Sequence, residues 1–322
     1  LSIPSDDLRK FPDILRFGTI SYKAIDIPLM IPLYGHRGFT LIVEDDNQKK
    51  TANRAIELMA FRILCSVPDG KCKFYIIDSE KNGQSFSNIF GFDPRILERE
   101  VWDDVTEIAN GLQDIKNDIP IVQSEILTTK YKDLKEYNEQ IQHSRKPFQF
   151  ILIANFPGNF NSNSLDHLQS IMKNGSKSGI YVLMSYDITR RLPSFDHFNH
   201  DDFRRLSVEY DFSNNKLLNI EDSDLFNEQF YVSSICDTLP SNIDSLKNQL
   251  NQALDKIYQL KLDVIDKNEY WTKSSSRGIT VPVGVSADNK LINLQFGDGK
   301  DVHHALIGGA TGKGKTVLLH DI

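Results

Sequence analysis

The octet Gly309-Ala-Thr-Gly-Lys-Gly-Lys315-Thr316 matches the pattern G-x-x-x-x-G-K-[ST] at every fixed position. Residues 304–308 before it have the composition of a short buried strand, and residues 317–320 after it open a helix. A strand, a glycine-rich loop and a helix in this order form a phosphate-binding P-loop. The octet therefore predicts an α/β fold with a central, mostly parallel sheet flanked by helices.

The chemistry of the octet predicts binding of ATP together with Mg²⁺. Its glycines permit backbone angles that aim successive N–H groups at phosphate oxygens, and the helix N-terminus adds its positive dipole end. Lys315 is expected on the β- and γ-phosphates and the Thr316 hydroxyl on Mg²⁺, so these two are the expected catalytic residues. The predicted nucleotide-binding residues are Gly309, Ala310, Thr311, Gly312, Lys313, Gly314, Lys315, Thr316 and Val317.

The composition of the chain is that of a globular protein with a packed core. Its 322 residues are 40% hydrophobic and 25% charged, with a net charge of −7. The three cysteines have no CxxC spacing, and the histidines have no paired metal spacing, so a disulfide framework and a zinc site are not expected. No apolar run reaches the roughly 20 residues that cross a bilayer, so we expect a cytoplasmic segment without membrane contact.

The region leading to the octet resembles a known family. Residues 281–286 (Val-Pro-Val-Gly-Val-Ser), 291–296 (Leu-Ile-Asn-Leu-Gln-Phe) and 303–320 are similar to the entry of an FtsK/SpoIIIE/HerA-type ATPase domain, which has a RecA-like P-loop fold. The resemblance implies a homo-oligomeric ring, expected to be a hexamer, that uses ATP to pump double-stranded DNA. In the type VII secretion branch of the family the cargo is protein.

A second copy of the architecture is expected upstream, with its nucleotide chemistry removed. Residues 39–43 form a predicted strand, and residues 44–51 (Glu-Asp-Asp-Asn-Gln-Lys-Lys-Thr) align with the octet, followed by an amphipathic helix. Glu44 and Lys49 replace the two fixed glycines, while Lys50 and Thr51 keep the final pair. Side chains at the glycine positions block the loop angles, and added carboxylates repel phosphate. We therefore predict no nucleotide binding here.

Other family landmarks follow in the expected order. Residues 73–78 form a predicted strand, and residues 150–156 lie where the resemblance places the Walker B strand, with Ala154 and Asn155 in place of its Asp-Glu pair. Residues 168–186 are similar to a further family segment that ends in a glutamine, and Tyr186 stands in place of that glutamine. The carboxylates of the Asp-Glu pair would hold Mg²⁺ and the attacking water, so their replacement by Ala154 and Asn155 removes hydrolysis. An unrelated α/β domain is the alternative interpretation.

Two further segments are expected to be helical. Apolar residues from Ile243 to Val264 repeat at spacings of three and four, which predicts a long helix that either packs on its own domain or forms a coiled coil. Residues 101–143 are rich in charge and are predicted to be a solvated helical connection. We expect a degenerate RecA-like domain at residues 1–235, a linker helix at 236–269, and the start of an active domain at 270–322.

Three functions of different class fit these expectations. The first is a DNA translocase, the second a type VII secretion-like protein-export ATPase, and the third a non-motor scaffold that binds ATP. The chain lacks an initiating Met and ends a few residues into the P-loop helix, so we expect it to be a segment of a longer protein. A Walker B acid pair downstream would exclude the scaffold, since hydrolysis needs it.

Overall fold

A computed structural model describes most of the chain and divides it into two compact units. The first unit comprises residues 1–137 and 146–258, and the second comprises residues 138–145 and 259–322. The structure describes residues 3–4, 9–22, 25–35, 38–80, 83–127, 130–141, 145–193, 198–214, 216–219, 231–234, 239–258, 276, 278–285 and 291–297. No helix of the described residues is both long and apolar enough to span a bilayer.

A seven-stranded sheet forms the centre of the first unit, in the order β5-β4-β6-β7-β3-β8-β9. Every neighbouring pair is parallel except β8 and β9, which are antiparallel. The mostly parallel sheet predicted from the sequence is therefore confirmed. The strands are β3 (Gly38–Val43), β4 (Cys72–Asp78), β5 (Leu97–Trp102), β6 (Phe148–Phe156), β7 (Ile180–Asp187), β8 (Val208–Asp211) and β9 (Lys216–Leu218).

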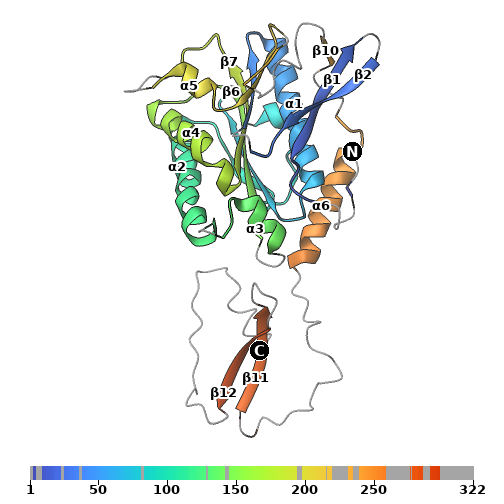
Figure 1. Ribbon diagram of the computed structural model, residues 1–322, viewed down its shortest axis with the longest axis vertical. Helices are drawn as coiled ribbons and strands as arrows, with labels where there is room; N and C mark the ends of the chain where they lie inside the picture. The colour runs from blue at the N-terminus through green and yellow to red at the C-terminus, as the bar shows by residue number, and fades with distance from the viewer. Residues whose placement is uncertain are drawn as a thin grey trace. The chain divides into compact units, whose positions relative to one another are not determined.

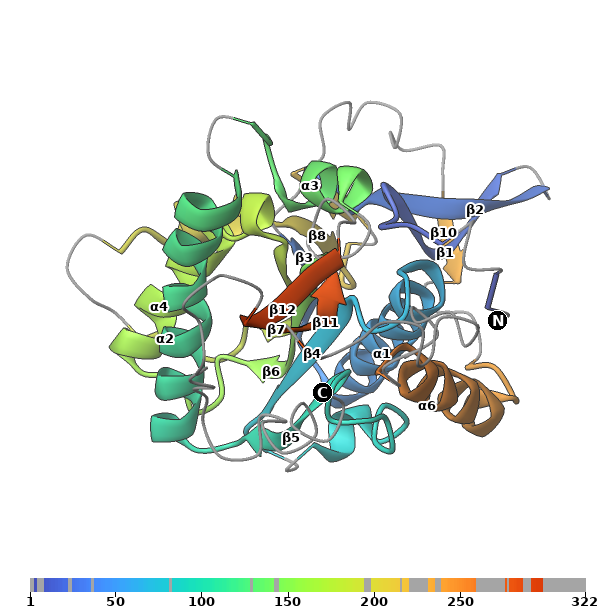
Figure 2. The same cartoon turned by 90° about the horizontal axis from the view of Figure 1, so that it is seen from below.

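Helices cover both faces of this sheet. Helix α1 (Asp46–Ser66) lies on one face, and α2 (Val105–Val122) and α4 (Ser162–Asn174) pack on the other, as Figures 1 and 2 show. β3, β6 and β7 are buried on both faces, so they are near-continuous apolar runs rather than alternating ones. Short helical turns complete the unit: η2 (Gln84–Phe86), η4 (Ser176–Ser178) and α5 (His200–Arg204).

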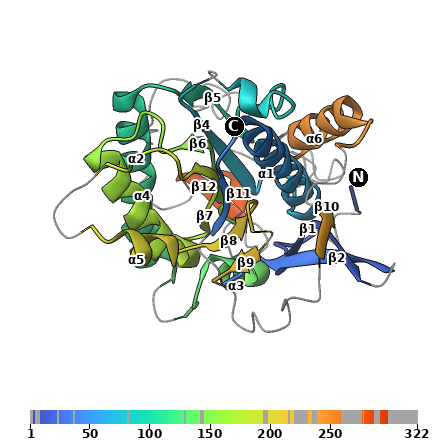
Figure 3. The same cartoon turned by 90° about the horizontal axis from the view of Figure 1, so that it is seen from above.

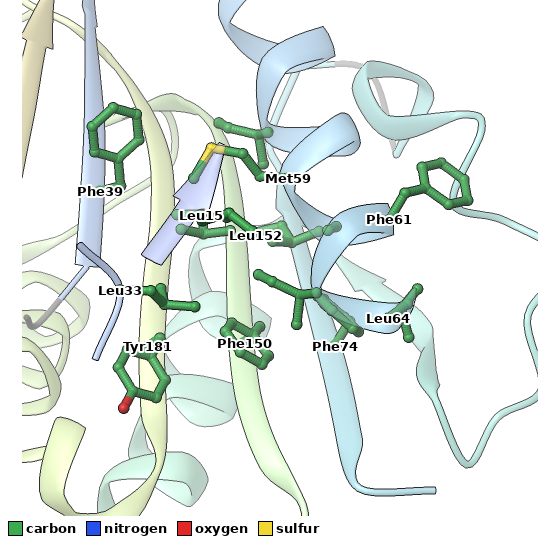
Figure 4. Packing of buried hydrophobic residues seen from close by; sticks show 14 of the residues in the cluster. Leu15, Leu33, Phe39, Met59, Phe61, Leu64, Phe74, Phe150, Leu152 and Tyr181 are labelled. Atoms are coloured by element: carbon green, nitrogen blue, oxygen red, sulfur yellow. The ribbon is translucent and has the colours of Figure 1, made fainter. Parts of the chain in front are cut away.

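Aromatic packing fixes α1 and the N-terminal segment against the sheet. The rings of Phe74 and Phe150 are stacked with centroids 5.1 Å apart, and Phe150 also stacks on Tyr181 at 5.5 Å. Met59 of α1 and Leu152 of β6 belong to the same cluster (Figure 4). Each such aromatic side chain buries a large apolar area, so this cluster supplies much of the driving force for folding.

A small antiparallel sheet flanks the α1 side, in the order β10-β1-β2. It is formed by β1 (Ile14–Tyr22), β2 (Ile25–Pro32) and β10 (Tyr231–Ser234). The edge strand β2 contains Pro28 and Pro32, which have no N–H group to donate. Addition of a further strand at this edge is therefore disfavoured.

The segment expected to be a solvated connection has more structure than the sequence predicted. Val101 and Trp102 belong to β5, and α2 begins only after Asp104, whose carboxylate accepts hydrogen bonds from the amides of Thr106 and Glu107. A π-helical turn, Gln123–Leu127, and α3 (Leu134–Gln140) follow. Tyr131 is only 8% exposed and meets the ring of Tyr137 edge to face. The prediction of one solvated helix was wrong because its apolar face is a core face.

Helix α6 (Ile243–Tyr258) belongs to the first compact unit. Leu246, Leu250 and Leu254 are buried, and the last two join the core that α1 shares. Of the two interpretations of this helix, packing on its own domain agrees with these contacts. Leu260 and Val264 of the predicted repeat lie outside the described residues, and the domain boundaries at 235 and 270 stay predictions.

The second unit contains an antiparallel pair of strands, β11 (Gly278–Val285) and β12 (Leu291–Gly297). Their register pairs Val281 with Leu294 and Gly278 with Gly297. Both were predicted as the strands that lead to the P-loop. The P-loop itself, residues 309–316, and Val317 lie outside the described residues.

Candidate functional site

The candidate site of the first unit is the carboxyl edge of the central sheet. β3, β4, β6 and β7 are mutually parallel, so their C-terminal ends meet at one edge. β7 lies between β3 and β6, whereas β8 lies on the other side of β3. In open α/β sheets such an edge is where ligands bind, near the point where the strand order reverses. The residues predicted as a degenerate nucleotide site are the ones found here.

The junction between β3 and α1 contains no phosphate-binding loop. β3 ends at Val43 and α1 begins at Asp46, so only Glu44 and Asp45 connect them. The Asp45 carboxylate accepts hydrogen bonds from the amides of Asn47 and Gln48, each 2.8 Å long. A carboxylate therefore occupies the helix N-terminus, which in a P-loop would receive a phosphate. The sequence prediction placed the helix after Thr51; it starts earlier because Asp45 caps it.

The lysines and the threonine of this copy do not face a common site. Lys50, which aligns with the phosphate-binding Lys315, is exposed on α1. The Thr51 hydroxyl donates to the carbonyl of Asn47 at 2.9 Å, one turn earlier in the helix. That hydroxyl is engaged by its own helix and is not presented as a Mg²⁺ ligand.

Lys49 is the lysine that reaches the strand ends. Its Nζ lies 2.7 Å from Oδ2 of Asp187, whose side chain is 1% exposed at the end of β7. Arg190 pairs with the same carboxylate through Nε at 3.0 Å and with Glu80, just beyond β4, through Nη2. This ion-pair network, Lys49, Asp187, Arg190 and Glu80, connects the start of α1 with the ends of β4 and β7. This network was not predicted from the sequence; the signal that the sequence offered was Asp187, an acidic residue at the end of a buried strand.

The pKa shifts within the ion-pair network show that it holds its charges. The hydrogen bond to Asp187 is the main cause that raises the pKa of Lys49 above its ordinary value of 10.5. Burial alone would raise the pKa of Asp187, but hydrogen bonds from Lys49 and Thr189 outweigh it and lower that pKa below 3.8. Both groups are therefore ionised at neutral pH.

Ala154 and Asn155 are surrounded by core side chains and structural hydrogen bonds, not by catalytic groups. Ala154 is 1% exposed and belongs to the core on the α1 face. Asn155 is buried with a left-handed φ of 56°, and its amide donates to the Ser185 hydroxyl at 2.9 Å. That hydroxyl in turn donates to Oδ1 of Asn53 at 2.7 Å, which links β6, β7 and α1. No carboxylate stands at either position to hold a metal or orient water.

These observations do not fit a Mg²⁺ nucleotide at this edge. A phosphate would have to displace the Asp45 carboxylate and enter beside Asp187, where like charges repel. Among the described residues no group of three or more His, Cys, Asp or Glu side chains could hold a metal ion. We derive no catalytic step through this site.

A double-mutant cycle tests the ion-pair network. Lys49→Met and Asp187→Asn should each destabilise the protein, with a coupling of about 1–2 kcal/mol in the free energy of unfolding, because each change removes the part-buried pair between Lys49 and Asp187. Lys50→Met, one residue away and exposed, should change it by less than about 0.5 kcal/mol. Urea denaturation measures all of these values, and additive effects of the first two changes would contradict the network.

The pH dependence of the same variants follows from the lowered pKa of Asp187. A carboxylate whose pKa is lower in the folded than in the unfolded state stabilises the protein at every pH above its unfolded pKa. This contribution is lost as the pH falls through the folded pKa. The unchanged protein should therefore lose stability below about pH 4 more steeply than Asp187→Asn. Equal slopes for the two proteins would be the contrary result.

Comparison with known proteins was made by sequence and by structure. The sequence matches no family model, and no curated protein matches it significantly. The structure is similar to EccC (ATPases 2 and 3) of Thermomonospora curvata in complex with a signal sequence peptide, with a TM-score of 0.53 and 10% sequence identity. The match covers 88% of this chain and 56% of that chain. It is also similar to EssC (ATPases 2 and 3) from Geobacillus thermodenitrificans, with a TM-score of 0.56 and 12% sequence identity. This match covers 91% of this chain and 60% of that chain.

A third solved structure, the cytoplasmic domain of the Thermomonospora curvata type VII secretion ATPase EccC, matches with TM-score 0.51 and 10% identity over 87% of this chain and 36% of that chain. The chain therefore spans less than two thirds of the length of these structures. At such identities the likeness concerns the fold. It confirms the predicted RecA-like α/β fold with a mostly parallel sheet flanked by helices.

Proposed function

We propose that this chain is part of a tandem ATPase of the protein-export kind, in which the first domain is a nucleotide-free scaffold and the second binds ATP. The observation that carries the proposal is the fold match over 88% and 91% of this chain to EccC and EssC, each comprising ATPases 2 and 3. The EccC structure with ATPases 2 and 3 contains a signal sequence peptide, and the third similar structure is described as the cytoplasmic domain of a type VII secretion ATPase. These matches favour protein export over the DNA pump that the sequence placed first.

The proposal gives the two copies of the motif different tasks. In the first, Asp45 and the ion-pair network fill the carboxyl edge with protein groups. In the second, the sequence of Gly309–Thr316 offers a P-loop in which Lys315 would bind phosphate and Thr316 would hold Mg²⁺. In this proposal ATP bound at the second copy supplies the free energy, and the first domain serves as a scaffold without nucleotide. Assembly into a homo-oligomeric ring, expected to be a hexamer, belongs to the same proposal.

ATP hydrolysis by the complete protein tests the cargo. We expect turnover to rise when a signal sequence peptide of an exported protein is added, and to be indifferent to double-stranded DNA. Stimulation by DNA alone would replace protein export with DNA translocation. A protein that binds ATP but hydrolyses none under either condition would be the scaffold considered from the sequence.

A further inference from the structure

A groove lies between the sheet's edge strand β5 and helix α2, and its lining includes none of the residues of the candidate site. It encloses about 470 Å³. β5 is the terminal strand of the seven-stranded sheet, so one of its backbone edges has no strand partner in that sheet. In Figure 3, β5 lies at the border of the sheet, beside the start of α2. The groove therefore lies next to an edge strand, and edge strands are a common site of peptide recognition.

The floor of the groove is aromatic. The rings of Tyr75 and Trp102 lie with centroids 5.4 Å apart. Trp102 packs directly on α2 at Gly111, where an added Cβ would lie only 2.5 Å from the indole ring. The glycine thus permits the indole to lie flat against the helix and to form a wall of the groove.

Both sides of the groove carry carboxylates. Glu98 and Glu100 project from one face of β5, and three acids at helical spacing line α2: Glu107, Asp114 and Asp118. In the part of the chain that the structure describes, Glu100, Glu107 and Asp114 have no ion-pair partner. The groove therefore has more negative charge than the described side chains neutralise.

Two of the lining residues, Glu98 and Tyr75, already contact a cation of the chain, Lys73. Nζ of Lys73 lies 2.7 Å from Oε2 of Glu98 and 5.3 Å from the centre of the Tyr75 ring. An ammonium held between a carboxylate and an aromatic face is the arrangement in which proteins bind cationic side chains. The lining of the groove also contains a second aromatic ring, Trp102, and the carboxylates of Asp114 and Asp118.

We propose that this groove binds a segment of a partner protein that carries arginine or lysine side chains. The aromatic floor would pack against the alkyl stems or guanidinium planes, and the carboxylates on both walls would pair with their charges. Asp118 lies eleven residues after Glu107, about 16 Å along a helix, which matches roughly five residues of extended peptide. A divalent cation does not fit as well, because the described acids form no metal-binding group. Nucleic acid would be repelled by the same charge.

Trp102 is a built-in reporter for this proposal, because the chain has two tryptophans and the other is Trp271. In a Trp271→Phe background, fluorescence of Trp102 can be titrated with a capped hexapeptide of alternating arginine and glycine. We expect a saturable change that a peptide with citrulline in place of arginine does not produce. Added salt should weaken the affinity, because the pairs are partly exposed. Saturation by the citrulline peptide at equal affinity, or no saturation at millimolar arginine peptide, would refute the proposal.

Matched charge variants locate the binding. Glu100→Gln with Asp114→Asn keeps the shape of the groove and removes two carboxylates that have no ion-pair partner among the described residues. This double change should weaken binding of the arginine peptide about tenfold. Asp201→Asn with Asp202→Asn removes the same charge from exposed positions in α5 and should leave the affinity within about twofold. Equal effects of both pairs would place the peptide outside the groove. The assay needs no nucleotide, so its result is independent of the proposed ATPase function.

Discussion

Arg9→Ala is expected to lower the free energy of unfolding by about 3–5 kcal/mol, the cost of breaking a buried ion pair. The Arg9 side chain is 1% exposed, and its Nη1 lies 2.5 Å from Oδ1 of Asp69. Its Nη2 donates to the carbonyls of Leu64 and Val67, at 3.0 and 2.6 Å, where α1 ends. The guanidinium thus satisfies carbonyls that a helix end leaves without partners and fixes the N-terminal segment to α1.

Urea denaturation measures this effect, with Lys10→Ala as the matched control. Lys10 is the neighbouring cation and is exposed, so its replacement should cost less than about 0.5 kcal/mol. Adding Asp69→Ala to Arg9→Ala should recover part of the loss, because it removes the stranded carboxylate. A loss below about 1 kcal/mol for Arg9→Ala would show that the pair contributes no more than a surface contact.

Lys315→Ala is expected to reduce ATP turnover of the complete protein by about 100-fold or more, the loss typical when a group that stabilises transition-state charge is removed. Lys50→Ala is the matched control, because Lys50 occupies the same position in the first copy of the motif. It is exposed on α1, beside a helix N-terminus already occupied by Asp45, so its replacement should leave turnover unchanged. Steady-state hydrolysis of both variants gives the comparison, and a similar loss in each would mean that the first domain also handles nucleotide.

The central strands could be predicted because burial on both faces leaves a strong signal. β3, β6 and β7 are near-continuous apolar runs rich in β-branched and aromatic residues, and the structure has strands at all three. The hairpin strands β11 and β12 were found for a different reason, since only their resemblance to a family entry identified them. Strand β5 was missed: its sequence Leu-Glu-Arg-Glu-Val-Trp alternates in charge like a solvated helix, and only its place at the sheet edge explains it.

The candidate site was only partly accessible from sequence. The lost glycines at Glu44 and Lys49 could be seen from the aligned motif, and so could the missing carboxylates at Ala154 and Asn155. The side chains that fill the site instead could not be seen from the sequence, because Lys49 and Asp187 are brought together only by the pairing of β3 with β7. The same limit applies to the buried ion pair of Arg9 and Asp69, which lie 60 residues apart in the sequence. Spacing along the chain reveals a motif, whereas tertiary contacts decide what replaces it.

We propose that this protein binds nucleotide in its second domain and fills the equivalent edge of its first domain with its own side chains. A photoreactive ATP analogue, bound to the complete protein with Mg²⁺ and mapped by mass spectrometry, tests it directly. The label should fall on peptides containing residues 309–317 and should disappear when excess ATP is added. ATP-sensitive labelling of peptides from the β3–α1 junction, residues 38–66, would contradict the account.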